Sequence, residues 1–232
     1  MSRRRWREQT PPASAPPSSG AAPFLTGPIG GGVDLEGQLT ILTVCTGNIC
    51  RSPMAEVLLR ARLEPLGVRA HSAGTHALIG HAMTEPAQDL AVEAGARAED
   101  AAAHRARYLR EPLLRDADLV LTMARSHSAH AIRMMPNRVR RTFTAREFAR
   151  LSVAVDADTA RAAAESAGQA PRARFAAVLA LLAEQRGLAT AGTDDDDVID
   201  PYRRSVETYA RSTAQLVPAI DEVERIVRAA IG

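Results

Sequence analysis

One short segment of the chain, Cys45 to Ser52, groups a thiol, a guanidinium and small loop residues. It follows a buried apolar run and leads into Ser52-Pro53, a typical helix start. Successive backbone N–H groups in such a loop and the positive end of the helix form an anion site, and the planar fork of Arg51 matches two phosphate oxygens. The same field favours a thiolate at Cys45, which is the nucleophilic form of this side chain. The segment therefore predicts a phosphate-binding loop with a nucleophilic sulfur.

The other loop residues are expected to contact the anion. We assign this binding role to Thr46, Gly47, Asn48, Ile49, Cys50 and Ser52. The Ser52 hydroxyl can also donate a hydrogen bond to the Cys45 sulfur when that sulfur becomes the leaving group. On the alternative interpretation, Cys45 is a small buried residue and Arg51 a surface cation, but the position of the loop between a strand and a helix start favours the chemical one.

The elements that must position this loop alternate along the chain. Short apolar, β-branched runs predict strands, and runs with a helical period predict helices. The predicted strands are 39–44, 68–73, 119–123 and 139–144, and the predicted helices begin at Ser52 and span 85–94, 109–116, 126–134 and 205–231. In the first helix, Ser52 is the expected N-cap and Pro53 the first helical residue. Such alternation indicates a parallel sheet with helices on both faces.

Composition divides the chain into three parts. Residues 1–36 are rich in Pro, Gly and Ser and are predicted to be a disordered tail. Residues 37–232 are predicted to form a single domain, in which an Ala- and Arg-rich stretch at about 154–193 is a helical insertion. The four aspartates at 194–197 are interpreted as a solvated linker.

Overall composition excludes several protein classes. The net charge is only +2, and every cation is an arginine, so we expect no nucleic-acid partner. No apolar run reaches the ~20 residues of a membrane span, and the Arg3-Arg4-Arg5 start lacks the apolar run of a signal peptide. The two cysteines do not form a secreted disulfide framework. A cytoplasmic protein with reduced thiols is the expectation, and its oligomeric state is left open.

Three motifs together resemble one known family. The run from Val44 to Glu56 reads VCTGNICRSPMAE, His71 to Thr75 reads HSAGT, and Asp200 to Tyr202 reads DPY. These resemble the signature loop, the segment after the second strand and the late acid loop of the low-molecular-weight protein tyrosine phosphatases. The resemblance implies a four-stranded parallel sheet of order 2-1-3-4 with helices on both faces. It also implies phosphotyrosine-containing protein substrates, and no metal or organic cofactor.

The resemblance also assigns roles to residues outside the loop. Cys45 would attack phosphorus to give a cysteinyl-phosphate, and Arg51 would hold the phosphoryl oxygens. Asp200 would protonate the leaving phenolate and then activate water, while Tyr202 would form one wall of the cleft. Ser72 and His104 match the residues that support Asn48 in the family.

One departure from the family leaves alternatives open. The aromatic residue expected on the opposite wall is absent, because that stretch reads His76-Ala77-Leu78-Ile79-Gly80. The rivals are an arsenate reductase on the same fold, coupled to an external small thiol, and a module that binds phosphoproteins without turnover. Cys50 could form a protective disulfide with oxidised Cys45, or it could only pack beneath the loop.

Overall fold

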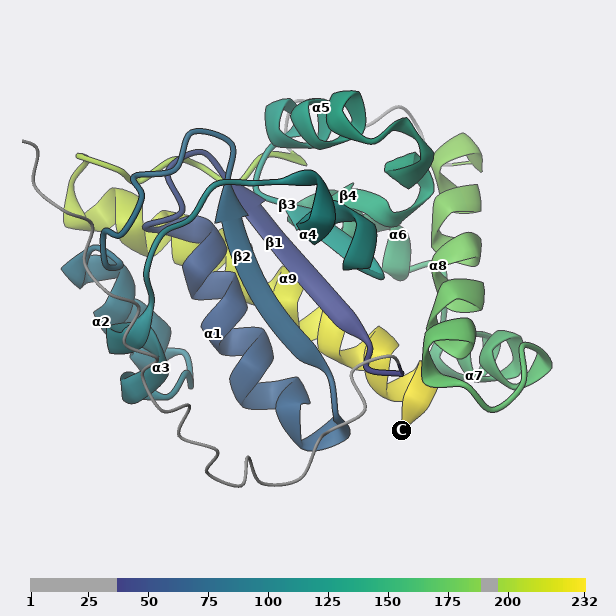
Figure 1. Cartoon of the computed structure of the whole chain (residues 1–232). Coiled ribbons are helices and arrows are strands. Elements are labelled where there is room, and N and C mark those ends of the chain that lie inside the picture. Colours follow the sequence, from purple (N-terminus) through teal and green to yellow (C-terminus); the bar gives the residue numbers. More distant parts are fainter. Residues whose placement is uncertain (1–36, 189–195) are drawn as a thin grey trace, which may run out of the picture. The chain divides into compact units, whose positions relative to one another are not determined.

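The computed structural model describes residues 37–188 and 196–232. The predicted N-terminal tail and the first two aspartates of the acid run lie outside these residues. The four strands are β1 (Thr40–Cys45), β2 (Arg69–Gly74), β3 (Leu119–Thr122) and β4 (Thr142–Thr144). All pairings are parallel and the strand order is β2-β1-β3-β4, which confirms the predicted sheet (Figure 1). All six residues of β1 are buried, as expected for a central strand covered on both faces.

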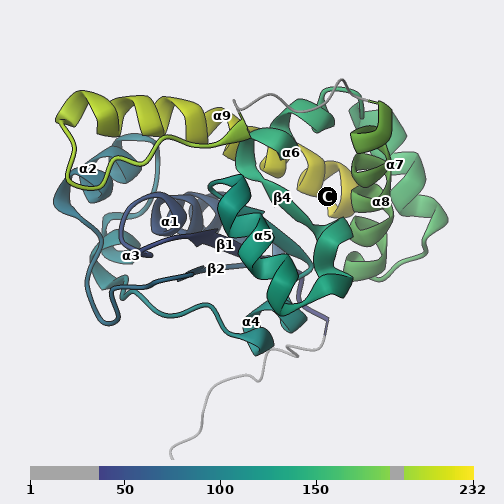
Figure 2. The same cartoon turned by 90° about the horizontal axis from the view of Figure 1, so that it is seen from above.

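Helices cover both faces of this sheet. The helices are α1 (Arg51–Leu63), α2 (Glu85–Glu93), α3 (Ala98–Ala103), α4 (Glu111–Asp116), α5 (Arg125–Met134), α6 (Ala145–Ser152), α7 (Ala157–Ser166), α8 (Pro171–Leu188) and α9 (Val206–Ile231). Figure 2 shows α1 and α9 on one side of β1 and β2, and α4 on the other. Along β1, Ile41 packs into the larger core with α1 and α9, whereas Leu42 and Val44 pack with Leu114 of α4. The strict alternation of strand side chains thus builds two cores.

Two local predictions were wrong, and the structure shows the reason for each. The expected strand 139–144 is only Thr142–Thr144, because Pro136 opens a 3-10 helix (Pro136–Arg141) in its place. Helix α1 begins at Arg51 with Cys50 as its N-cap residue, so Ser52 is not the cap. The Ser52 hydroxyl instead contacts the Cys45 sulfur.

The interpretation of the acid run as a solvated linker was also wrong where the structure describes it. Asp196 is 7% exposed, and its carboxylate pairs with Arg150 at 2.8 Å. The Asp197 carboxylate accepts a hydrogen bond of 2.7 Å from the backbone N–H of Arg125 at the start of α5. The contacts of Asp196 with Arg150 and of Asp197 with Arg125 therefore fix the position of the chain just before Asp200.

Helices α7 and α8 fall within the stretch expected to be helical. Both pack against α9, and they contribute Ala160, Ala164, Phe175 and Val178 to the larger core. Figure 1 shows these two helices beside the β4 end of the sheet, away from the loop that follows β1. Their contribution to the described molecule is therefore packing at this end of the sheet.

Candidate active site

The loop from Cys45 to Ser52 joins β1 to α1 and surrounds the Cys45 sulfur with donors. The Asn48 N–H lies 3.3 Å and the Ser52 hydroxyl 3.0 Å from this sulfur. Because the loop ends at the N-terminus of α1, its backbone N–H groups and the helix dipole act at the same place. The loop thus places Ser52 where its hydroxyl can donate to the sulfur.

Asp200 lies next to this loop, although it is about 150 residues away in sequence. One terminal nitrogen of Arg51, Nη2, pairs with Asp200 Oδ2 at 2.7 Å, and the other, Nη1, donates to the Val198 carbonyl at 2.9 Å. Arg51 is buried, whereas 55% of the Asp200 side chain is exposed. The third guanidinium nitrogen, Nε, is buried and has no hydrogen-bond partner among the residues that the structure describes. Arg51 thus joins the two loops and retains one unused donor.

Together these residues line a cavity of about 210 Å³. Its lining includes Cys45, Thr46, Gly47, Ile49, Cys50 and Arg51 from the loop, and Asp200 and Tyr202 from the late segment. The cavity therefore brings together the expected nucleophile, the anion-binding guanidinium and the expected acid. Asn48 and Ser52 are fully buried and do not line it, so their contribution is to the shape of the loop.

The opposite wall of the cavity differs from the expectation. Leu78 lines it, as does His76, whose ring stands edge-on to His130 with centroids 6.0 Å apart. Ala77 is buried and is not part of the lining. The wall facing Tyr202 is therefore an imidazole and an aliphatic side chain. The imidazole of His76 is an aromatic group on this wall that the sequence reasoning did not assign.

The backbone of Asn48 is in the left-handed region, with φ of 57°. Four groups hold it there: Ser72 Oγ and Ser52 Oγ accept from the Asn48 side-chain amide at 2.7 and 3.0 Å, His104 Nε2 contacts the Asn48 carbonyl at 2.8 Å, and the Arg107 N–H donates to Asn48 Oδ1 at 2.9 Å. Asparagine tolerates this conformation better than most residues. Ser72 and His104 thus lie where the resemblance placed them.

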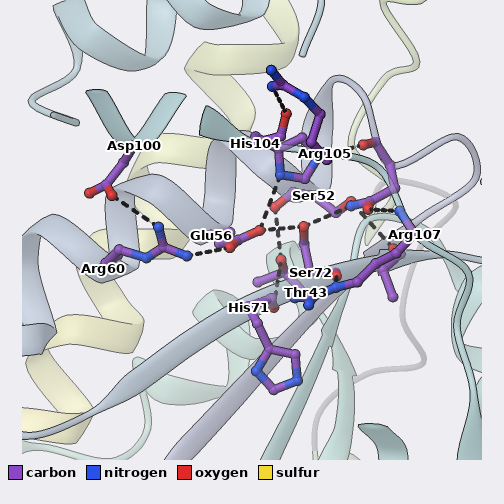
Figure 3. A network of polar contacts seen from close by, with 12 residues as sticks. Thr43, Ser52, Glu56, Arg60, His71, Ser72, Asp100, His104, Arg105 and Arg107 are labelled. Carbon is purple, nitrogen blue, oxygen red and sulfur yellow. Dashed lines mark hydrogen bonds and ion pairs between the residues drawn. The ribbon is translucent and has the colours of Figure 1, made fainter. Parts of the chain in front are cut away.

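Glu56 connects these supporting residues to one another. The Ser72 hydroxyl donates to Glu56 Oε2 at 2.5 Å, and His104 Nδ1 lies 3.5 Å from the same oxygen. Arg60 pairs with the other carboxylate oxygen, so that Glu56 stands at the centre of the network in Figure 3. Burial opposes ionisation of Glu56, but the hydrogen bonds from His104 and Ser72 outweigh it and lower its pKa. The carboxylate therefore stays ionised as a fixed acceptor.

A close backbone approach explains the glycine in the His71–Thr75 motif. A Cβ on Gly74 would lie 2.5 Å from the carbonyl oxygen of Thr46. This carbonyl accepts the His76 N–H, and the Cys45 carbonyl accepts the Thr75 N–H, both at 2.9 Å. The end of β2 therefore lies directly against the loop, and only glycine fits there.

Cys50 is buried on the inner side of the loop. Its thiol lies 3.4 Å from Thr84 Oγ1 and 3.6 Å from the hydroxyl of Tyr209, a residue of α9. Burial raises the pKa of Cys50, and the nearby Cys45 and Asp200 add to this shift. Both cysteines are free thiols.

His127 is a site neighbour that sequence reasoning missed. Its Nε2 lies 2.8 Å from the hydroxyl of Thr46, and its Nδ1 is buried without a partner. Burial, reinforced by the positive charge of Arg51, lowers the pKa of His127 to about 4, so the ring is neutral near pH 7. No local motif marks a histidine at the start of α5 as a loop contact. Glu56, in contrast, lies within the VCTGNICRSPMAE run and could have been considered.

Across 37–188 and 196–232, no three His, Cys, Asp or Glu side chains gather in a way that could hold a metal ion. Within the same ranges, no helix has the length and apolarity needed to cross a membrane.

Comparisons with known proteins agree with this geometry. Residues 40–186 match the family model described as low molecular weight phosphotyrosine protein phosphatase. The low molecular weight protein-tyrosine-phosphatase Etp of Escherichia coli K12 is 43% identical over 97 residues, which are 42% of this chain and 62% of Etp. The corresponding phosphatase Ptp of Acinetobacter johnsonii is 41% identical over 103 residues, which are 44% of this chain and 69% of Ptp. The chain thus spans less than two thirds of the length of Etp.

Solved structures with the same fold cover more of the chain. The tyrosine phosphatase Wzb of Escherichia coli K30, in complex with sulphate, aligns with a TM-score of 0.53 and 27% identity over 80% of this chain and 95% of Wzb. The YwlE arginine phosphatase of Geobacillus stearothermophilus aligns with a TM-score of 0.55 and 28% identity, over 80% of this chain and 90% of YwlE.

Proposed function

This chain belongs to the low molecular weight phosphotyrosine protein phosphatase family, and on that premise we propose that it hydrolyses phosphotyrosine in proteins, and aryl phosphates, with Cys45 as nucleophile. The observation that carries the proposal is the single cavity lined by Cys45, Arg51 and Asp200. It contains a nucleophile, an oxyanion-binding fork and an acid, the three groups that phosphoryl transfer from an ester to a thiol requires.

In the first step, the Cys45 thiolate attacks phosphorus. An S–P bond forms, the P–O bond to the phenol breaks, and the leaving oxygen takes a proton from Asp200. Arg51 and the N–H groups of the loop hold the other phosphoryl oxygens. The unpartnered Nε of Arg51 and the Nη2 now on Asp200 form the edge of the guanidinium best suited to bidentate binding. An incoming phosphoryl group would therefore replace the Asp200 carboxylate on Arg51. Asp200, carrying a proton taken up from solvent, would then face the leaving oxygen as the acid.

In the second step, the same groups act in reverse. Asp200, now ionised, takes a proton from a water molecule that attacks the cysteinyl-phosphate. The S–P bond breaks, inorganic phosphate forms, and the sulfur leaves as a thiolate. Ser52, which lies 3.0 Å from this sulfur, stabilises the thiolate by donating its hydroxyl proton in a hydrogen bond.

The cleft walls support a planar aryl group as the part of the substrate next to phosphorus. Tyr202 is 38% exposed and Leu78 36% exposed, so both can cover a ring that enters between them. The guanidinium of Arg203 lies over the Tyr202 ring, 5.1 Å from its centroid. We therefore assign the substrate class as proteins that present phosphotyrosine on their surface. A nucleophilic thiol works only where it stays reduced, so we place this activity in the cytoplasm.

A substrate panel tests the proposal. Purified full-length chain is assayed with a phosphotyrosine peptide, a phosphoserine peptide and a phosphoarginine peptide of the same sequence, and Cys45→Ser serves as the control. We expect hydrolysis of the phosphotyrosine peptide, none with Cys45→Ser, and no effect of chelators. The phosphoarginine arm is included because YwlE is an arginine phosphatase. A preference for phosphoarginine, or reduction of arsenate with a small thiol at a higher kcat/KM, would overturn the assigned substrate. Binding of the phosphotyrosine peptide without turnover would leave only a binding module.

A further inference from the structure

A second cavity of about 320 Å³ lies behind the phosphate loop and shares no lining residue with the catalytic cavity. It lies between α1, α3, β2 and the segment that follows α3. Its volume is within the range of small-molecule sites in proteins. The catalytic steps proposed above use none of its space.

Unmatched positive charge distinguishes this second cavity. Its three carboxylates, Glu56, Glu64 and Asp100, each pair with Arg60 or Arg97. Three further guanidiniums on its wall, those of Arg69, Arg105 and Arg107, pair with no carboxylate among the described residues. Arg105 donates only to the carbonyls of Ala102 and His104, and Arg107 donates its Nε to the carbonyl of Ser72. Each of the three therefore has guanidinium donors that no carboxylate among the described residues accepts.

The wall of this cavity is also the support of the phosphate loop. Glu56 and His104 line it, and both act on Asn48, His104 directly and Glu56 through Ser72. Arg107 contributes its backbone N–H to Asn48 Oδ1 and its side chain to Ser72. Figure 3 shows Glu56 between Arg60 and Ser72, with Arg105 and Arg107 close to the same network. A group bound among these arginines would therefore contact residues that fix the catalytic loop.

We propose that this second cavity is an effector site for a small anion that carries two or more phosphoryl or carboxylate groups. Arginine forks bind such groups bidentately, and a multiply charged ligand can engage more than one of Arg69, Arg105 and Arg107 at once. The bound anion screens the repulsion among these cations, which favours the position of the 105–107 segment that holds Asn48. Binding therefore raises kcat/KM of the phosphatase, and this part of the proposal depends on the proposed function.

A binding experiment tests the site without reference to turnover. Cys45 is first alkylated with iodoacetate, which closes the catalytic cavity to anions, and tripolyphosphate or citrate is then titrated by calorimetry. We expect one site per chain. Replacing both Arg69 and Arg105 by Gln should weaken binding at least about tenfold, a change of ~1.4 kcal/mol, because two charge-assisted contacts are lost. Arg133→Gln is the matched control, since Arg133 is exposed on α5 and pairs with no carboxylate among the described residues; it should bind like the parent protein.

Comparing the affinities of the two anions shows which chemical group the site prefers. Tighter binding of tripolyphosphate assigns the site to phosphoryl groups, and tighter binding of citrate assigns it to carboxylates. If neither anion binds the alkylated protein, or if the double variant binds as well as Arg133→Gln, the effector site is overturned. With unmodified enzyme, the anion should raise kcat/KM about two- to threefold in Arg133→Gln and not in the double variant, as expected of a coupling below 1 kcal/mol. Anion binding with no hydrolysis of any phosphoester would overturn the proposed function and leave the site standing.

Discussion

Asp200 contacts the phosphate loop through its ion pair with Arg51. The exposure of the Asp200 side chain supports the role of proton donor proposed for it. A carboxylate that served only to hold Arg51 would be buried with it, yet more than half of the Asp200 side chain is open to solvent. It also accepts the Tyr202 N–H at 3.2 Å, which fixes its direction at the mouth of the cavity. These contacts fit a proton donor that meets the leaving group as the substrate enters.

Asp200→Ala should lower kcat by ~10²–10⁴-fold, the usual contribution of a general acid. The loss should become smaller along a series of aryl phosphates with leaving groups of decreasing pKa, because those phenolates need less protonation. Steady-state kinetics on such a series measures the trend. Asp221→Asn, an exposed carboxylate on α9 that pairs with Arg62, is the control and should keep full activity. A loss that is the same for every ester would assign Asp200 a structural role instead.

Cys50 should protect Cys45 from irreversible oxidation. A thiolate in the anion site is oxidised to sulfenic acid, and a neighbouring thiol can condense with it to a disulfide. In Cys50→Ser, the new hydroxyl can keep the contacts with Thr84 and Tyr209, so the fold and the reduced activity should persist. Brief peroxide followed by dithiothreitol should restore the parent enzyme and not the variant. Equal recovery of both proteins would mean that Cys50 only packs beneath the loop.

At the level of helices and strands, neighbouring elements hold the loop after β1 in a conformation that includes a left-handed residue. Asn48 needs a positive φ, and the ends of β2 and α3 supply the groups that stabilise it. The network uses buried hydrogen bonds, and removing one partner from such a bond leaves the other unsatisfied. Loop geometry, and with it catalysis, should therefore depend on residues that never contact the substrate.

Ser72→Ala tests this dependence. The change removes one of the two acceptors of the Asn48 side-chain amide, the other being Ser52 Oγ, and one donor to the buried Glu56 carboxylate. We therefore expect a loss of about 1–3 kcal/mol in the free energy of unfolding. In addition, kcat/KM should fall roughly tenfold or more, which is a shift of at least ~1.4 kcal/mol in transition-state stabilisation. Urea unfolding and steady-state kinetics measure the two effects. Ser166→Ala, which removes only a local bond to the Ala163 carbonyl, is the control. If kcat/KM is unchanged under conditions where the variant is fully folded, the network does not position the loop.

The parts of the fold that follow from local chemistry could be predicted. β-Branched apolar runs identified β1 and β3, and the strand–loop–helix context identified the anion site. Helix α6 was missed, although Thr144 and Glu147 form a capping box at its start, a signal that the sequence carries. The contacts of His127 with Thr46 and of Arg107 with Asn48 span 81 and 59 residues. Only the tertiary structure brings such residues together, so no local pattern could have predicted them.

At the scale of the whole molecule, two buried histidines should make folding sensitive to pH. Burial, together with the positive charges of Arg107 and Arg69, lowers the pKa of His71 to about 4, and the pKa of His127 is lowered to the same value. Both ring nitrogens of His71 lack a partner in the described structure. In the unfolded chain these histidines would titrate near 6.5. Between pH 6.5 and 4, these two histidines therefore bind protons in the unfolded chain but stay neutral in the folded protein.

The contribution of these histidines to the free energy of unfolding should be fully present above pH 6.5 and should fall as the pH drops toward 4. Each histidine contributes on the order of 3 kcal/mol over this window. Urea unfolding of the parent protein at pH 7.5, 6.0 and 5.0 measures the slope. His71→Leu should remove about one proton of the pH dependence, while His81→Leu, an exposed residue, should leave the slope unchanged. A slope in His71→Leu equal to that of the parent would mean that His71 is protonated in the folded state.

The covalent intermediate on Cys45 is the central claim, and it can be observed directly. Asp200→Ala slows the second step, because water then lacks its general base, so the cysteinyl-phosphate should accumulate. Acid quenching of this variant within seconds of mixing with p-nitrophenyl phosphate, followed by peptide mass mapping, should locate one phosphoryl group on Cys45. The parent enzyme should show much less of it, and the same peptide in the Cys45→Ala, Asp200→Ala double variant should carry none. Hydrolysis by Asp200→Ala with no phosphoryl group on Cys45 at any quench time would contradict the account.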